Sequence, residues 1–585
     1  MGACATCGCG EPRANSSNKP VRGSPFAGLL IAIALLAQVP VHAQPSTVQP
    51  GVVERERTDA PKPRSPSEVS IPSMESPSAF QDAQSTKFVL KRVTIEGNNA
   101  IADDVLMGPF NDLVGKEVTI GQVFAATEAI TRIYDAAGYA LSLAYVPVQD
   151  VENGALLIRV IEGFIGDVRI NDTRSTRSAR WDEYAAKLKA SRPLKSADLE
   201  RYLLLISDLA GVKATNTFER MTDGEPGAMR LVMTIERKYI GAQLGLNNRG
   251  SKAIGPLRES ANVDFNGVLG IEERLSIFGV TAIEDNELAY YGGRLDVPLG
   301  SEGTVMSFEA ARSQTQPGTA ALSALAYEAV GWTGSAAISL AVIRSLRQNL
   351  YGSVGLLHKN LKSDILALDN SHDRLTALAL TADYDARARW GGTTRVVASL
   401  FVGLDMLDAT QEGDPLSSRA GASGEFTRLE VSASHLMSLS DRFSLFTEIA
   451  GQVASGPLLV SEQCGYGGGY IGRAFDPFEV TGDHCVKGRA ELRFDVPLEY
   501  QGLSSVLDNV QLYALGDFGV MIKAGDLLPL EERVETAESI GIGIRFKARR
   551  FLSGFVEAVQ PLDRGVALEN GSRDPRIFFG LSADY

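Results

Sequence analysis

The stretch Ile240-Gly241-Ala242-Gln243-Leu244-Gly245-Leu246 shows the residue pattern that characterises the second half of the chain. Its aliphatic and alanine side chains alternate with Gly and Gln, so one face of an extended strand is apolar and the other is small or polar. Similar alternation recurs at residues 274–280, 290–297, 305–311, 394–404, 443–453, 491–496, 510–515 and 542–546. Such segments, separated by polar turns, are typical of a transmembrane β-barrel that is apolar toward lipid.

A soluble β-sandwich is the alternative explanation of this alternation. The roughly 350 residues after residue 238 hold more strands than a sandwich needs, and barrel closure removes exposed strand edges. No apolar run of helical membrane-spanning length follows the first 45 residues. A membrane-spanning structure in this part of the chain would therefore be a closed barrel.

The first 43 residues predict a secretory signal peptide. Basic residues precede the apolar run 26–37, and Val41-His42-Ala43 follows it. The run is shorter than the about 20 residues of a membrane-spanning helix, so we expect cleavage before Gln44 rather than a retained anchor. The mature chain is then expected outside the cytosol.

The positions of the cysteines are consistent with a location outside the cytosol. Cys4, Cys7 and Cys9 leave with the signal peptide, whereas Cys464 and Cys485 remain. In an oxidising compartment the remaining pair predicts a disulfide that closes a loop of about 20 residues. Two free thiols are the alternative, because spacing alone does not bring the sulfurs together.

Composition restricts the partners and cofactors of this chain of 585 residues, which is long enough for several domains. A net charge of −14 argues against nucleic acid as a partner. The 5 histidines show no metal-ligand spacing, and no phosphate-binding loop motif occurs, so we predict neither a metal nor a cofactor. Residues 44–86 are rich in Pro, Ser, Gln and Glu and predict a disordered periplasmic linker, or at most a weak helix. The prolines at 61, 63, 66, 72 and 77 argue against a helix that plugs the barrel.

Two small α+β domains are predicted before the barrel. Residues 87–163 contain a first strand, a helix that begins with the capping box of Thr119 and Gln122, and two further strands at 141–148 and 156–161. Residues 164–238 repeat this plan, with a strand at 165–170, a helix at 199–209, and strands near 213–219 and 229–235. The repetition predicts tandem modules of one type.

The first of these domains carries a recognisable set of residues in a fixed order. They are Gly97, Asn98, Gly138, Tyr139, Pro147, Gln149, Glu162 and Gly163. In the second domain, Leu194 and the segments 198–201 and 208–212 also fit. Both domains resemble the POTRA domains of the two-partner secretion transporters, the family of haemolysin and filamentous-haemagglutinin exporters.

The barrel half resembles the same family. The resemblance rests on the turn Asn247-Asn248-Arg249-Gly250, the segment 295–300, and the aromatic C-terminus at Tyr585. It implies a mainly β chain with POTRA 1 at 87–163, POTRA 2 at 164–238, and an antiparallel barrel of 16 strands at 239–585.

The resemblance also implies a site inside the barrel. Residues around 461–488 would form an extracellular loop folded back into the lumen, with a tip that reads Val-Arg-Gly-Tyr in the family. Gly472-Arg473-Ala474-Phe475 supplies the arginine and the aromatic, whereas Ala474 replaces the glycine. The family pairs this arginine with an aspartate, here Asp517, and a guanidinium and a carboxylate can make two parallel hydrogen bonds. The residues taken alone favour a solvated loop arginine and an ordinary turn carboxylate, and the family pattern reverses that preference.

The function that the resemblance implies is export of a specific large exoprotein across the outer membrane of a Gram-negative bacterium. The expected partners are an exoprotein with an N-terminal secretion domain, outer-membrane lipid, and the outer-membrane assembly machinery. The alternatives are an insertase for outer-membrane proteins, a passive porin, and, least favoured by the residues, an enzyme.

Overall fold

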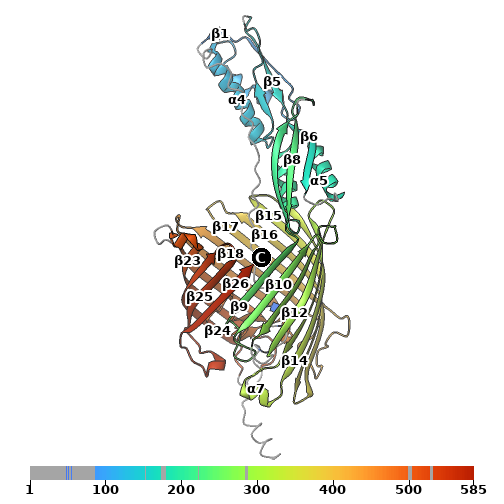
Figure 1. Ribbon diagram of the computed structural model, residues 1–585, viewed down its shortest axis with the longest axis vertical. Helices are drawn as coiled ribbons and strands as arrows, with labels where there is room; N and C mark the ends of the chain where they lie inside the picture. Colours follow the sequence, from blue (N-terminus) through green and yellow to red (C-terminus); the bar gives the residue numbers. More distant parts are fainter. Residues whose placement is uncertain are drawn as a thin grey trace, which may run out of the picture. The chain divides into compact units, whose positions relative to one another are not determined.

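The computed structural model describes residues 48, 51, 54–55 and 86–585, apart from 152, 173–178, 222, 284–286, 499–502 and 528–530 (Figure 1). The predicted signal peptide and most of the predicted linker lie outside the described residues. Within the described part of the chain, no helix is both long and apolar enough to cross a membrane.

The first α+β domain is built on the parallel pair β2 and β5, with β4 antiparallel to β5. Its elements are β1 (Lys87–Val89), β2 (Arg92–Glu96), α3 (Asp103–Met107), η3 (Gly108–Phe110), β3 (Glu117–Thr119), α4 (Ile120–Ala136), β4 (Leu143–Tyr145) and β5 (Ala155–Ile161). The predicted capping box begins α4: the Gln122 amide donates to Thr119 Oγ1 at 3.2 Å, and the Thr119 amide donates to Gln122 Oε1 at 2.8 Å. The buried face of α4 packs on β5 and so closes the core.

The second α+β domain has the same sheet plan, with β8 central, parallel to β6 and antiparallel to β7. Its elements are β6 (Phe164–Asp172), α5 (Ala179–Ala190), α6 (Ser196–Ser207), β7 (Val212–Arg220) and β8 (Ala228–Arg237). Helix α5 was not predicted, although the buried Trp181, Tyr184, Ala185 and Leu188 have the spacing of a helix face.

Sixteen antiparallel strands close a barrel, as predicted, in the order β9 to β19, β22 to β26 and back to β9. They are β9 (Ile240–Asn247), β10 (Arg258–Asn266), β11 (Arg274–Ala282), β12 (Leu288–Leu299), β13 (Thr304–Thr315), β14 (Glu328–Arg344), β15 (Gln348–Ile365), β16 (Leu368–Arg387), β17 (Thr393–Leu404), β18 (Thr427–Ser438), β19 (Phe443–Ala454), β22 (His484–Asp495), β23 (Leu507–Ile522), β24 (Val534–Ala548), β25 (Leu552–Pro561) and β26 (Arg576–Asp584). Short helices α7 (Ala320–Ala324), η6 (Leu503–Ser505) and η7 (Ala567–Glu569) lie between strands. The predicted fold class is thereby confirmed.

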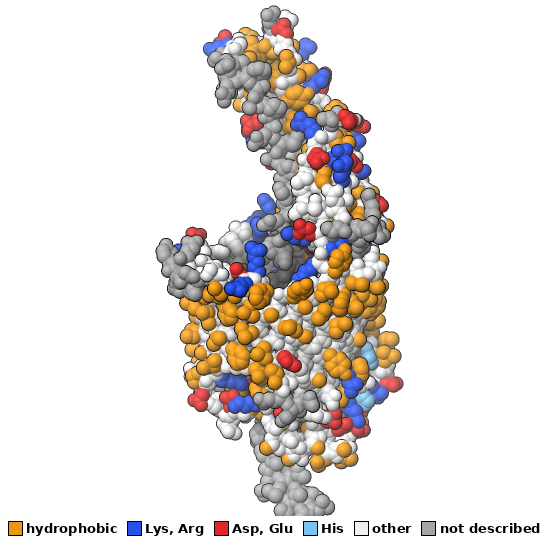
Figure 2. Space-filling model, in the orientation of Figure 1, with side chains coloured by type: hydrophobic (Ala, Val, Ile, Leu, Met, Phe, Trp, Pro, Cys, Tyr) orange, Lys and Arg blue, Asp and Glu red, His pale blue; other side chains and the backbone are white. Residues whose placement is uncertain are grey.

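The two faces of the barrel wall differ in polarity. Leu244 on β9, Ile277 on β11 and Phe308 on β13 are exposed on the outer face. Figure 2 shows hydrophobic side chains gathered in a belt around the visible wall, with charged side chains at both rims. Strand alternation places the intervening residues on the inner face, where they line a polar lumen.

The glycines of the predicted POTRA motif occupy positions where a left-handed backbone or a nearby carbonyl oxygen disfavours a side chain. Gly97 has a φ of +92°, and a Cβ there would lie 2.3 Å from the Val160 carbonyl oxygen. A Cβ at Gly163 would lie 2.2 Å from the Leu141 carbonyl oxygen. Gly138, with a φ of +87°, lies just after α4. These glycines therefore allow close chain approaches and turns that other residues would disturb.

The polar motif residues hold chain segments together. The Gln149 amide accepts from the Leu157 amide and donates to the Leu157 carbonyl, both at 2.7 Å, and it also reaches the Pro147 carbonyl at 3.3 Å. Asn98 Nδ2 donates to the Ile101 carbonyl at 3.1 Å. The Tyr139 ring meets Tyr134 edge-on, with centroids 6.1 Å apart. Each residue thus has a structural role within the first domain.

Glu162 is the hub of these contacts. Its carboxylate accepts from the Asn99 amide, the Ala100 amide and the Tyr134 hydroxyl at 2.7, 2.7 and 2.8 Å. Burial raises the pKa of this carboxyl, but these hydrogen bonds outweigh burial and hold the pKa below its ordinary value. The carboxylate therefore fixes the turn after β2 to α4.

We predict that Glu162→Gln destabilises the first domain by about 1–3 kcal/mol, because a neutral amide accepts these hydrogen bonds less well. Since the folded pKa lies below the ordinary 4.5, the wild-type contribution is present above that pH and is lost as the pH falls through the folded pKa. Urea unfolding of the fragment 86–238 between pH 3 and 7, followed by circular dichroism, measures both effects.

The matched control is Glu128→Gln on α4 of the same domain, whose carboxylate is exposed and pairs only with Arg132 in the described structure. This control should change stability by less than about 0.5 kcal/mol. Equal effects of the two substitutions at pH 7 would contradict the role of Glu162.

Candidate functional site

The chain between β19 and β22 folds into the barrel instead of away from it. It contains η4 (Val460–Glu462) and the two-stranded hairpin of β20 (Cys464–Tyr466) and β21 (Val480–Gly482). Ile471, Ala474 and Phe475 in this segment are buried together with Tyr513 and Leu515 of the wall strand β23. We call residues 455–483 the lumen loop.

The tip of the lumen loop is a tight turn. The Phe475 amide donates to the Gly472 carbonyl at 2.9 Å. Gly472 has a φ of +90°, and a Cβ there would lie 2.6 Å from the Tyr466 ring. Ala474 and Phe475 are buried, and the Phe475 ring packs on Tyr466. The glycine that this turn requires therefore precedes the arginine, and Ala474 is accommodated after it.

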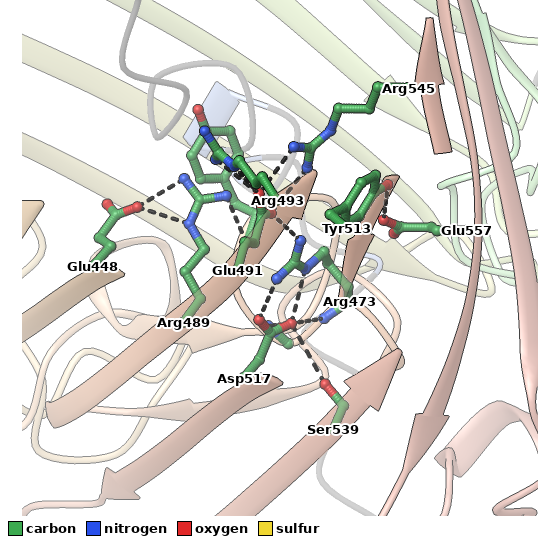
Figure 3. Close-up of polar contacts among 12 residues, drawn as sticks. Glu448, Arg473, Arg489, Glu491, Arg493, Tyr513, Asp517, Ser539, Arg545 and Glu557 are labelled. Carbon is green, nitrogen blue, oxygen red and sulfur yellow. Dashed lines mark hydrogen bonds and ion pairs between the residues drawn. The ribbon is translucent and has the colours of Figure 1, made fainter. Parts of the chain in front are cut away.

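The structure places Arg473 against Asp517 of β23 (Figure 3). Nε of Arg473 donates to Asp517 Oδ2 at 3.0 Å, and Nη2 donates to Oδ1 at 2.6 Å. The amides of Gly472 and Arg473 also donate to Oδ2, at 3.1 and 3.0 Å. Arg473 is 1% exposed and Asp517 is 4% exposed, so the forked pair is shielded from solvent.

A second carboxylate, Glu491 of β22, completes the site and was missed in the sequence analysis. It is fully buried and accepts from Nη1 of Arg473. It also accepts from Arg493 Nε at 2.9 Å and from both terminal nitrogens of Arg545 at 2.9 Å. The alternating charges of Arg489, Glu491 and Arg493 were the available signal, since they share one face of a strand.

Further cations of the barrel wall bind carbonyl groups of the lumen loop. Lys487 Nζ donates to the Gly465 carbonyl at 2.8 Å, and Arg576 Nη1 donates to the Ala474 carbonyl at 2.8 Å. The Arg249 guanidinium reaches the Arg473 carbonyl at 3.2 Å. The backbone of the loop is therefore held from β22, from β26 and from the turn after β9.

The predicted disulfide is present between Cys464 and Cys485, with an S–S distance of 2.00 Å and a Cα–Cα distance of 6.3 Å. Cys464 lies in the hairpin strand β20, and Cys485 lies in the wall strand β22. The bond ties the root of the lumen loop covalently to the wall.

Residues 48, 54 and 55 of the predicted linker 44–86 contact the barrel wall or the lumen loop. The Thr315 hydroxyl donates to the Val48 carbonyl at 3.0 Å, and Glu54 lies 3.8 Å from the Lys359 ammonium. Gly51, Glu54 and Arg55 are helical, and Arg55 donates to the Ser461 carbonyl at 3.0 Å.

The prediction of a disordered linker does not hold at residues 48, 51, 54 and 55, and the helix that was the alternative is present at 51, 54 and 55. Composition indicates disorder because polar residues cannot build an apolar core. The inner wall of a barrel, however, offers polar and charged partners to a polar segment.

No group of three His, Cys, Asp or Glu side chains in the described ranges lies close enough to hold a metal ion. The charged groups of the site are instead paired with one another. Such an arrangement is suited to fixing a chain segment in place.

Solved structures share this fold. The chain resembles CdiB from Escherichia coli with a TM-score of 0.65 and 17% identity, over 97% of this chain and 100% of that chain. CdiB from Acinetobacter baumannii follows with a TM-score of 0.59 and 14% identity over the same shares, 97% and 100%.

Curated relatives match most of the sequence. The heme/hemopexin transporter protein HuxB of Haemophilus influenzae strain 86-028NP is 23% identical over 552 residues, 92% of this chain and 94% of that protein. The outer membrane transporter CdiB of Dickeya dadantii is 22% identical over 401 residues, 67% of this chain and 68% of that protein.

Two family models match the sequence directly. Residues 88–163 match the POTRA domain, ShlB-type, and residues 231–544 match the haemolysin secretion/activation protein ShlB/FhaC/HecB. The second match covers more than half of the chain. With the closed barrel and the POTRA fold, it places the protein in the outer membrane of a Gram-negative bacterium, with its POTRA domains in the periplasm. The chain belongs to the haemolysin secretion/activation family ShlB/FhaC/HecB, the outer-membrane transporters of two-partner secretion.

Proposed function

We propose that this two-partner secretion transporter exports one specific large exoprotein in extended form, past a lumen loop that Arg473 tethers to the wall. The observation that carries the proposal is the burial of Arg473 between Asp517 and Glu491. A buried guanidinium without a carboxylate is strongly unfavourable, so the loop tip is favoured where both carboxylates lie. The tether then sets the free width of the lumen.

The periplasmic domains supply a means of receiving the cargo. In the second domain β7 is an edge strand of the sheet β6-β8-β7. An extended segment can add to such an edge through main-chain hydrogen bonds, which require little sequence specificity. We propose that an N-terminal secretion domain of the exoprotein docks in this way before its chain enters the barrel.

Family membership and the outer-membrane location also bear on activity, driving force and insertion. Because the family consists of transporters, we propose neither enzymatic activity nor a cofactor for this chain. Folding of the cargo outside the cell would supply the driving force. Outer-membrane lipid surrounds the apolar belt, and we propose that the assembly machinery recognises the last strand, β26, during insertion.

We predict that Arg473→Ala and Asp517→Ala variants insert into the outer membrane but secrete at least about tenfold less exoprotein. Removing one partner of a buried ion pair costs about 3–5 kcal/mol, which releases the loop tip from its position. Quantitative immunoblotting of the culture medium, with heat-modifiable mobility to verify folding, measures the effect.

Asp441→Ala is the matched control for this experiment. Asp441 is an exposed carboxylate in the turn between β18 and β19, and its removal should leave secretion unchanged. Secretion at the wild-type level by both tether variants would refute the role of the pair. A fall in general outer-membrane protein levels without loss of any exoprotein would instead support the insertase alternative.

We also predict that the Cys464–Cys485 disulfide stays closed during export, because it fixes only the root of the loop and leaves the tip free to shift. Cells that export cargo should show no labelling of either thiol by a membrane-impermeant maleimide. Labelling that rises in proportion to export would contradict a loop root fixed on the wall.

A Cys464→Ser/Cys485→Ser variant should lose about 2–4 kcal/mol of stability, measured by thermal unfolding in detergent.

A further inference from the structure

The outer face of strands β13 to β16 changes from apolar side chains to basic, aromatic and amide side chains toward its extracellular end. Phe308, Ala336, Leu356 and Leu378 form one outward row of paired positions on the four strands. Four residues further along β13, the corresponding row reads Arg312, Trp332, Asn360 and Arg374. The β12–β13 turn contains Glu302, which contacts the periplasmic second domain, so the second row lies toward the extracellular end.

The second row therefore begins where the apolar belt ends. Figure 2 shows histidine, basic and acidic side chains beyond the hydrophobic belt at the lower rim of the barrel. On β12, Tyr291 pairs with Arg312 and extends the row. Trp332 is 53% exposed and Tyr291 is 52% exposed, as expected for aromatic residues at the level of lipid headgroups.

Arg312 differs from the other cations of this region. Its guanidinium lies 5.0 Å from the centroid of the Trp332 ring, and within the described structure it makes no ion pair. Arg374, by contrast, lies 3.4 Å from Asp408, and Lys362 contacts Asp364 at 3.2 Å and Asp369 at 2.7 Å.

The acidic side chains Asp364, Asp369 and Asp408 thus form ion pairs with Lys362 and Arg374 and not with Arg312. Asp408 is 84% exposed, so its pair with Arg374 is worth little in water. Arg312 is held by an aromatic ring at the edge of the apolar belt, with its charge available to a further anion.

We propose that Tyr291, Arg312 and Trp332 bind the phosphorylated sugar headgroup of a glycolipid in the outer leaflet. The planar guanidinium matches the geometry of a phosphate and can donate two hydrogen bonds to it. The exposed aromatic rings offer flat apolar faces to the sugar, and the row of Phe308, Ala336 and Leu356 contacts the acyl chains. Asn360, next in the row, supplies a further hydrogen-bonding group.

An ordinary aromatic girdle would position the barrel in the bilayer without choosing between headgroups. The proposed site instead requires the phosphate, because the unpaired charge of Arg312 is its central element. Selectivity for phosphate separates the two explanations.

The test uses the full-length protein in detergent and native mass spectrometry with bis-phosphorylated lipid A as the probe. Wild type should bind it about tenfold more tightly than Arg312→Gln, since one charge-assisted bidentate contact is removed. Wild type should also prefer it over dephosphorylated lipid A, and Arg312→Gln should lose that preference. Arg312→Lys, which keeps the charge but not the fork, should bind with intermediate strength.

The matched control is Arg347→Gln, in the periplasmic turn between β14 and β15, which should bind like wild type. Equal binding by wild type and Arg312→Gln, or equal binding of phosphorylated and dephosphorylated lipid A by wild type, would overturn the proposal. Displacement of lipid A by millimolar inorganic phosphate would assign the site to free anions and would also overturn it. Heat-modifiable mobility verifies that each variant is folded.

Discussion

The guanidinium of Arg473 is buried among the carboxylates of Asp517 and Glu491, and the position of the lumen loop depends on this contact. Glu491 also binds Arg493 and Arg545, so the tether belongs to a connected network on the inner wall of β22 to β24. Because these side chains are buried, each ion pair is stronger than it would be in water. Removing any one partner leaves a buried charge unpaired and destabilises the structure. The network therefore joins a loop to three wall strands, which no single surface ion pair could do.

Barrel closure creates the environment in which such a network can exist. Every wall strand is paired on both sides, so the outer face can be apolar while the inner face remains polar and shielded. The same separation explains why residues of the predicted linker, such as Glu54 and Arg55, find partners inside the barrel. On the outer face, the end of the apolar belt leaves Arg312 at the level where lipid headgroups lie.

Sequence patterns predicted the barrel, the two α+β domains, the Thr119 capping box and the Cys464–Cys485 disulfide, because each depends on local alternation or spacing. Strands such as β10 and β15 were not predicted, since Glu259 and Asn360 interrupt the apolar pattern of their outward faces. Family resemblance directed attention to Arg473 and Asp517. Glu491 was not predicted, because its ion pair with Arg473 depends on strand register and on the folding of the loop. Spacing along the chain does not reveal either of these.

We infer that this ion network keeps the lumen loop inside the pore. Single-channel conductance in planar lipid bilayers tests it most directly, by comparing wild type with Asp517→Ala. We expect small, infrequent openings for wild type and larger, more frequent openings for the variant, because its loop tip is no longer held. Identical conductance and open probability for the two proteins would show that Asp517 does not hold the lumen loop in the pore.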